Sequence, residues 1–379
     1  MAASTDKTGF AFEGGLVHLK VQTAFGTAAA GAADQSLPLT DDGDGMDYAF
    51  DHTDETTLDE IADRSDLHDL ERSISRGTIK TFAWSSGIGM LLKRLLGTET
   101  VTGSVAPWQH SFTVAKNLVG SGALLPFSLF VEKGTILLYD PAASPTNQGN
   151  LKSTFRFRDQ KVDSLELNYQ FGRPLALTWG LLGAQKNRGY GAAVPAALLP
   201  PAGTPVFMYM NSPAPPTHST NTPGFAGTGI SGYAGSGAIV VRPKSLVIRI
   251  QNGLDIEDCF RLSNTDIEVE HNRGQKMLVT AEMDMDWDWT ANALYAASQD
   301  RTVMGSIVFD LLHGSGTAQR ELKITMPQFH PESPTVKPNN KGRYTMRFTG
   351  KARRDMTTPS TPVGPLTIDV FNGDSAAAA

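Results

Sequence analysis

Residues 163–178 read DSLELNYQFGRPLALT, and residues 265–280 read TDIEVEHNRGQKMLVT. The two stretches align without a gap, so that Glu166 meets Glu268, Gly172 meets Gly274 and Thr178 meets Thr280. Each stretch alternates apolar and polar residues, passes a glycine and alternates again, which is the pattern of a β-hairpin. A hairpin written twice predicts one supersecondary unit used in tandem.

The likeness extends upstream of the hairpins. Residues 128–134 resemble 247–253, since each is an apolar strand pattern that ends at a glycine, and 155–157 resemble 260–262. We therefore expect a mainly β protein with two tandem β-sandwich units, each flanked by a short helix. The expected parts are an N-terminal strand, arm and acidic loop (1–75), a first unit (76–184), a long Pro/Gly-rich loop or insertion (185–238), a second unit (239–352) and a C-terminal tail (353–379).

Local patterns place the elements within these parts. Apolar residues at helical spacing predict a helix over Ser85–Leu96, stopped by Gly97, and a second helix over Thr290–Ser298 with Thr290 as its cap. Residues 26–56 are rich in alanine and glycine and then acidic, which favours a long loop, and 57–75 suggest helical turns. The expected strands are 10–23, 77–84, 108–115, 124–133, 151–158, 162–171, 173–182, 243–251, 259–271, 277–288, 302–312, 319–326 and 342–352.

Composition restricts the function classes. A hydrophobic fraction of 40% and a charged fraction of 19% are those of a folded globular protein. The formal net charge of −6 argues against a surface that binds nucleic acid by neutralising phosphates. The N-terminus lacks the apolar core of a signal peptide, and no stretch approaches the roughly 20 apolar residues of a membrane span. We expect a protein that is made in a cytoplasm and stays soluble until it assembles.

Patterns for catalysis, cofactors or metals are missing. The eight histidines show no metal-ligand spacing, and the acidic run Asp41–Asp47 fails the EF-hand register because Met46 stands at a ligand position. Cys259 is the only cysteine, so the chain has no disulfide framework. Trp287 and Trp289, two residues apart on an expected strand, form either a core stripe or a stacking platform for a sugar or base.

One polar pattern remains. Glu282, Asp284, Asp286 and Asp288 alternate with apolar residues, so a strand places all four carboxylates on one face. Ser164, Glu166, Asn168 and Gln170 alternate in the same way in the first hairpin. These residues form either an ordinary solvated sheet face or the negatively charged lining of a channel.

At this point the chain resembles the tail tube (major tail) proteins of long-tailed bacteriophages, in a large form with a duplicated tube domain. The likeness rests on the order of several weak features: the strand ending at Gly253, the hairpin around Gly274, the helix after it, the strand 305–311 and the closing strand 343–348. It covers most of residues 76–352.

The resemblance implies a β-sandwich subunit whose inner sheet joins those of its neighbours into a β-barrel ring, and rings that stack into a tube for viral DNA. It implies no cofactor and no enzyme activity, a place in the virion tail, and contacts with the tape-measure protein, the tail terminator and baseplate proteins. Glu166, Asn168, Gln170, Glu282, Asp284, Asp286 and Asp288 are then candidates for the channel lining. A duplicated domain further predicts three chains where single-domain relatives use six.

Other functions stay open from the sequence. A related tail component, such as a distal tail or tail-completion protein, has the same kind of pattern. A two-domain β-sandwich that binds carbohydrate through Trp287, Trp289 or the long loop is the alternative from another class, and a hydrolytic enzyme comes third.

Overall fold

The computed structural model describes residues 16–22, 33–54, 68–114, 127–136, 151–170, 173–184, 189–190, 209–210, 219–220, 244–255, 270–271, 276–299, 307–313, 316–332, 334–339, 341–354 and 364–373. Within them the chain is mainly β, with two short α-helices, α1 (Gly89–Leu96) and α2 (Trp289–Gln299). A thirteen-stranded and a five-stranded sheet carry the fold, and two further strand pairs lie apart from them. The expected mainly β fold is confirmed, and the arrangement is that of a β-sandwich.

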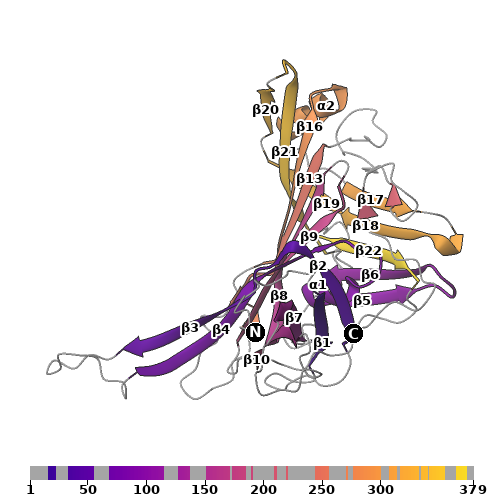
Figure 1. Ribbon diagram of the computed structural model, residues 1–379. Coiled ribbons are helices and arrows are strands. Elements are labelled where there is room, and N and C mark those ends of the chain that lie inside the picture. The colour runs from indigo at the N-terminus through magenta and orange to yellow at the C-terminus, as the bar shows by residue number, and fades with distance from the viewer. Residues whose placement is uncertain are drawn as a thin grey trace, which may run out of the picture.

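Eight strands of the large sheet follow one another as an unbroken antiparallel series. In spatial order they are β3 (Asp47–Asp54), β4 (His68–Phe82), β9 (Ala176–Ala184), β8 (Leu151–Gln170), β13 (Ser245–Gln251), β16 (Leu278–Asp286), β21 (Tyr344–Arg353) and β20 (Thr335–Pro338). Figure 1 shows β20 and β21 at one end of this series and the β3–β4 hairpin projecting from the body at the other. We call it the long sheet.

A second layer branches from the long sheet at β8. The first half of β8 pairs with β7 (Phe127–Ile136), which continues through β1 (Leu16–Val21) and β2 (Gln35–Asp44) to β4. The branch lies at Asp159, whose φ of 57° is in the left-handed region. The Gln22 side chain holds this bend, because its Nε2 donates to Asp159 Oδ1 at 2.7 Å and its Oε1 accepts from the Asp159 N–H at 2.8 Å.

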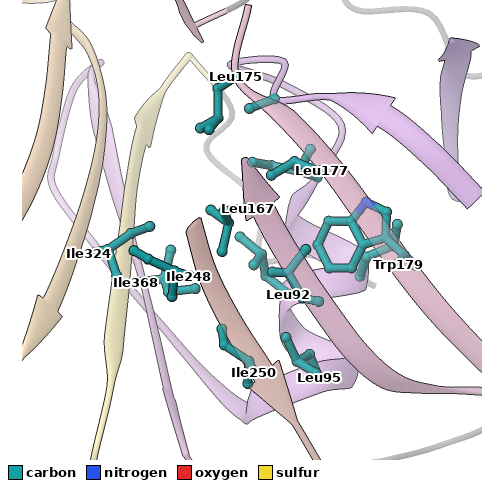
Figure 2. Close-up of a cluster of buried hydrophobic side chains, with 14 of the residues drawn as sticks. Leu92, Leu95, Leu167, Leu175, Leu177, Trp179, Ile248, Ile250, Ile324 and Ile368 are labelled. Atoms are coloured by element: carbon teal, nitrogen blue, oxygen red, sulfur yellow. The ribbon is translucent and has the colours of Figure 1, made fainter. Parts of the chain in front are cut away.

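The five-stranded sheet covers the apolar face of the long sheet. Its order is β17 (Ile307–His313), β18 (Arg320–Met326), β22 (Thr367–Asn372), β6 (Trp108–Val114) and β5 (Gly97–Thr102). Figure 2 shows Ile324 and Ile368 from this sheet facing Ile248 and Leu167 of the long sheet, all of them buried. This interface is the main core of the molecule.

Helix α1 fills the core beside the two sheets. Leu92 and Leu95 are buried next to Trp179 of β9, as Figure 2 shows. The helix ends at Gly97, where φ is 94° and the N–H bonds back to the Lys93 carbonyl. At the other end the Met90 N–H donates to Gln35 Oε1 at 3.0 Å. The predicted stop at Gly97 is confirmed, while the helix begins at Gly89 and not at Ser85.

Two segments before residue 76 differ from their prediction. Residues 35–44 and 47–54, expected in a loop, form β2 and β3, and residues 68–75, expected in helical turns, belong to β4. Residues 55–67 lie outside the described part. The reason is tertiary, since acidic segments with weak strand preference are stabilised here by pairing with β4, which itself pairs with β9.

The duplicated hairpin can be followed in part. The first copy forms β8 and β9, with Glu166 opposite Thr178. At an offset of 102 residues, β16 matches β9 in length and in its alternation of buried residues. Gly172, Gly274 and residues 256–269 lie outside the described residues, and β15 (Glu270–His271) pairs with β14 (Leu254–Asp255) in a separate two-stranded sheet. The pairing of β13 with β8 joins strands of the two predicted units in one sheet.

Candidate functional site

The long sheet has one apolar and one polar face. On β16 the side chains of Val279, Ala281, Met283 and Met285 are buried in the core, so Thr280, Glu282, Asp284 and Asp286 lie on the opposite face. The same alternation on β13 buries Leu246, Ile248 and Ile250 and leaves Arg249 exposed. We call the second surface the polar face.

Both expected sets of lining residues lie on the polar face. Glu166, Asn168 and Gln170 of β8 alternate with buried neighbours, and β13 lies between β8 and β16. Arg249 of β13 is opposite Glu166 on one side and Thr280 on the other. The structure thus brings six of the seven candidates, from two distant segments, onto one continuous surface.

Asp288 is the exception. The strand expected to reach Asp288 ends at Asp286, and α2 begins at Trp289. Asp288 caps that helix, because its Oδ1 accepts from the Ala291 N–H at 2.8 Å and its carbonyl from the Asn292 N–H at 2.9 Å. Aspartate is a preferred N-cap residue, and the cap expected at Thr290 is therefore two residues too late.

The tryptophan pair also leaves the strand. Trp287 packs edge-on against Tyr295 of α2, with ring centroids 5.6 Å apart, and belongs to the partly buried shell of the core. Trp289 is the first residue of α2. The two residues therefore do not lie two apart on one strand face, as the stacking platform requires.

Ion pairs cross the polar face from strand to strand. Arg249 Nε lies 2.7 Å from Glu166 Oε2, and Arg249 Nη1 lies 3.5 Å from Glu282 Oε2. The other oxygen of Glu282 pairs with Arg347 of β21. Glu166, Arg249, Glu282 and Arg347 thus form a line of alternating charge over β8, β13, β16 and β21, which we call the ion-pair row.

Further contacts balance the remaining carboxylates. Lys244 Nζ lies 2.5 Å from Asp286 Oδ1, and Ser245 Oγ donates to Asp284 Oδ2 at 3.1 Å. On and beside the described strands from β8 to β21, the polar face carries five carboxylates (Glu166, Glu282, Asp284, Asp286 and Glu332, which pairs with Lys351) and five cations (Lys244, Arg249, Arg347, Lys351 and Arg353). The acidic strip expected from β16 alone is therefore neutralised by its neighbours.

The basic partners were missed although a signal for them exists. Thr345, Arg347, Thr349, Lys351 and Arg353 alternate along the closing strand as regularly as the carboxylates along β16. The register places Arg347 opposite Asp284 and Lys351 opposite Thr280. Sequence alternation shows which residues share a strand face, but not that β21 pairs with β16.

These pairs contribute little to folding. The side chains of Arg249 and Glu166 are 45% and 37% exposed, and exposed ion pairs contribute about 0–1 kcal/mol each. The core behind the sheet provides the stability. The residues of the polar face are therefore free to be selected for the molecule that contacts this face.

The described residues show no other candidate site. Among them, no three of His, Cys, Asp and Glu are placed to hold a metal ion. His110, on β6, bonds through Nδ1 to Glu99 at 2.9 Å with both side chains nearly buried, as a structural histidine does. None of the described helices has the length and apolar character that a membrane crossing needs.

Comparison with known proteins identifies the chain. A sequence model of the family described as phage tail tube protein matches residues 14–350, which is nearly the whole chain. A comparison with curated proteins gives no match. The match extends from β1, in the second layer, to most of β21 in the long sheet, and it agrees with the β-sandwich architecture. The chain belongs to the phage tail tube family and is a structural, self-assembling subunit of the tail of the virion.

Proposed function

We propose that the polar face of the long sheet lines the channel of the tube, and that three chains close each ring. The observation that carries this is the unbroken series of eight antiparallel strands, in which β8, β13, β16 and β21 each have one buried and one polar face. At the ends of the series, β3 and β20 have one neighbour each within the described residues. Unpaired edges favour pairing with another chain, and a closed barrel removes them.

Barrel geometry relates the number of strands to the bore. With strands about 4.8 Å apart and tilted by about 40°, 16 strands give a backbone diameter of about 32 Å and 24 strands about 48 Å. Side chains occupy about 5 Å at each wall, which leaves bores of about 22 and 38 Å. Duplex DNA is about 20 Å across with grooves up to about 8.5 Å deep, so only the wider bore leaves room for hydration and passage. Three chains of eight strands supply the 24 strands.

The two-unit hypothesis accounts for seven of the eight strands. The first unit, 76–184, contributes β9, β8 and part of β4, and the second, 239–352, contributes β13, β16, β21 and β20. The eighth strand, β3, comes from the N-terminal part. A ring of three chains then has approximate sixfold symmetry. In this proposal the duplex passes without specific binding, the tape-measure protein occupies the channel before ejection, and the tail terminator and baseplate proteins contact the tube ends.

Cysteine labelling of assembled tubes tests the lining. In a Cys259→Ser background, Asn168→Cys places a thiol on the polar face, and the control Thr100→Cys places one at an exposed position of β5, on the opposite side of the molecule's core. A small maleimide should modify both thiols in intact tubes. A maleimide on a bead wider than the bore should modify Cys at position 100 and spare position 168.

Disassembled subunits provide the reference, since both sites should then react with both reagents. Bead labelling of position 168 in intact tubes at the rate of position 100 would place the polar face outside and end the lining proposal.

A further inference from the structure

We propose that the carboxylates of the ion-pair row act mainly by contact: they occupy the guanidinium groups of Arg249 and Arg347, so that DNA phosphates find no free arginine in the channel. This inference rests on the proposed lining role of the polar face. It assigns a task to Glu166 and Glu282 that differs from general repulsion of DNA.

An unoccupied arginine in this position is a binding site for phosphate. The guanidinium group is planar, always charged and suited to two parallel hydrogen bonds with a phosphate. Arg249 lies on a central strand of the sheet with 45% of its side chain exposed, and Arg347 is 58% exposed. In stacked rings these groups recur along the whole channel, so even weak contacts to a passing duplex would add up.

The geometry leaves both guanidinium groups engaged. Glu166 approaches Arg249 from β8 at 2.7 Å, and Glu282 approaches it from β16 at 3.5 Å while also pairing with Arg347. Because Glu282 lies between the two arginines, it serves both. Its own side chain is only 19% exposed, as expected for a group enclosed by its partners.

Repulsion alone does not explain the row. From β8 to β21 the described polar face has five carboxylates and five cations, so its net charge there does not favour exclusion of phosphates. Salt also screens exposed charges over about 8 Å at physiological ionic strength, whereas partly buried groups such as Glu282, which is 19% exposed, are screened less. Occupation of each arginine by an adjacent carboxylate needs neither a net negative charge on the face nor a long-range field.

The test measures retention of a short duplex by assembled tubes. Fluorescent 20-base-pair DNA is mixed with full-length tubes, and the fraction that sediments with them is recorded at 50 and 200 mM salt. In the Glu166→Gln/Glu282→Gln variant we expect retention at 50 mM salt to rise about tenfold, and to fall by about tenfold at 200 mM, as for about two phosphate contacts. Adding Arg249→Gln and Arg347→Gln should return retention to that of the wild type.

Two further variants show whether DNA retention depends on the arginine–carboxylate contacts or on the net charge. Glu166→Gln/Gln170→Glu keeps the charge of the face and moves one carboxylate four residues, about 13 Å, along β8. It leaves two guanidinium groups to share Glu282, so retention should still rise several-fold. Asp369→Asn/Glu321→Gln removes two carboxylates from the five-stranded sheet and should leave retention unchanged.

The outcomes are decisive in both directions. Unchanged retention in assembled Glu166→Gln/Glu282→Gln tubes, or in Glu166→Gln/Gln170→Glu tubes, overturns the inference, as does an equal rise in the five-stranded-sheet variant. If the double variant does not assemble, Glu282→Gln alone should show an intermediate rise, because Glu166 still holds Arg249. Labelling of position 168 decides separately whether the lining proposal itself stands.

Discussion

At the scale of single residues, Asn252 connects three parts of the core. Its side-chain Nδ2 donates to the carbonyls of Leu95 at 2.9 Å and of Val162 at 3.0 Å, and its backbone N–H donates to the Asp163 carbonyl at 2.7 Å. The residue is 2% exposed. One amide thus joins the end of α1, the middle of β8 and the end of β13.

Asn252→Ala should therefore lower the free energy of unfolding by about 2–3 kcal/mol, because two buried carbonyls lose their donor. Urea denaturation of the unassembled subunit measures the loss. Asn292→Ala, at an exposed position of α2, is the matched control and should change stability by less than about 0.5 kcal/mol. Equal losses in the two variants would contradict the connecting role.

A second residue-scale prediction concerns pH. Burial raises the pKa of Asp310 on β17, and burial together with the nearby Asp310 charge raises the pKa of Glu321 on β18. A carboxyl whose pKa is higher in the folded state stabilises the protein below its unfolded pKa of about 4, and this stability is lost as pH rises through the folded pKa. Ionisation of Asp310 at neutral pH therefore lowers the free energy of unfolding.

Asp310→Asn removes that cost without changing the size of the side chain. We expect the variant to have a higher Tm than the wild type at pH 7.5 and nearly the same Tm at pH 4. Asp286→Asn, at a half-exposed carboxylate, makes the same chemical change on the polar face and should not reproduce the pattern. If Asp310→Asn raised the Tm more at pH 4 than at pH 7.5, the raised pKa assigned to Asp310 would be refuted.

At the scale of elements, sequence patterns predicted the strands and helices whose formation depends on neighbouring residues in the chain. The hairpin of β8 and β9, the strands β13 and β16 and both helices follow from alternation, helical spacing and end residues such as Gly97. The strands β2, β3 and the first half of β4 do not, because their segments become strands only by pairing with each other and with β9. Asp288 was wrongly placed on the strand for a local reason. Its side chain caps α2, so β16 ends at Asp286, before the alternation in the sequence does.

A close approach of elements makes Gly350 on β21 essential. A Cβ built there would lie 2.3 Å from the ring of Phe329 and 2.6 Å from the His330 carbonyl, both on or beside β19 (Gln328–Pro331). Gly350→Ala should cost about 1–3 kcal/mol of stability, because backbone has to shift. Gly364→Ala is the control, since its nearest contact is an ordinary 3.4 Å to Val114. Thermal unfolding of both variants tests the difference, and equal Tm values would count against the packing described.

At the scale of the whole molecule, the chain repeats an order of elements. The series β4–α1–β5–β6 and the series β16–α2–β17–β18 both run strand, helix, antiparallel strand pair, and the two pairs flank β22 in the five-stranded sheet. This recurrence equates β16 with β4, whereas the sequence match equates β16 with β9, the neighbour of β4. The topological recurrence spans more elements, and we therefore regard it as the better guide to the unit.

The polar face shows which features of the whole molecule could not be predicted from the sequence. Alternation identified Glu166, Asn168, Gln170, Glu282, Asp284 and Asp286 as two separate sets. Their union on one surface depends on β13 lying between β8 and β16, with partners 75–87 residues apart in the first pairing and 27–39 residues apart in the second. The charge balance of the face depends in the same way on β21. Neither pairing is encoded in any local pattern, so neither could be predicted from one sequence.

The proposed number of chains per ring rests on this joining of strands. Since one chain contributes eight adjacent strands to the long sheet, three chains supply the strand count that a duplex-wide bore requires. We expect native mass spectrometry of rings released from tubes to show three chains of 40.7 kDa each, and averaged end-on images to show threefold symmetry with a sixfold appearance near the channel. The departures from sixfold symmetry should lie on the surface that carries residues 185–238. A ring of six chains, with half of each long sheet away from the channel, would contradict both the count and the assignment of β13, β16 and β21 to the wall.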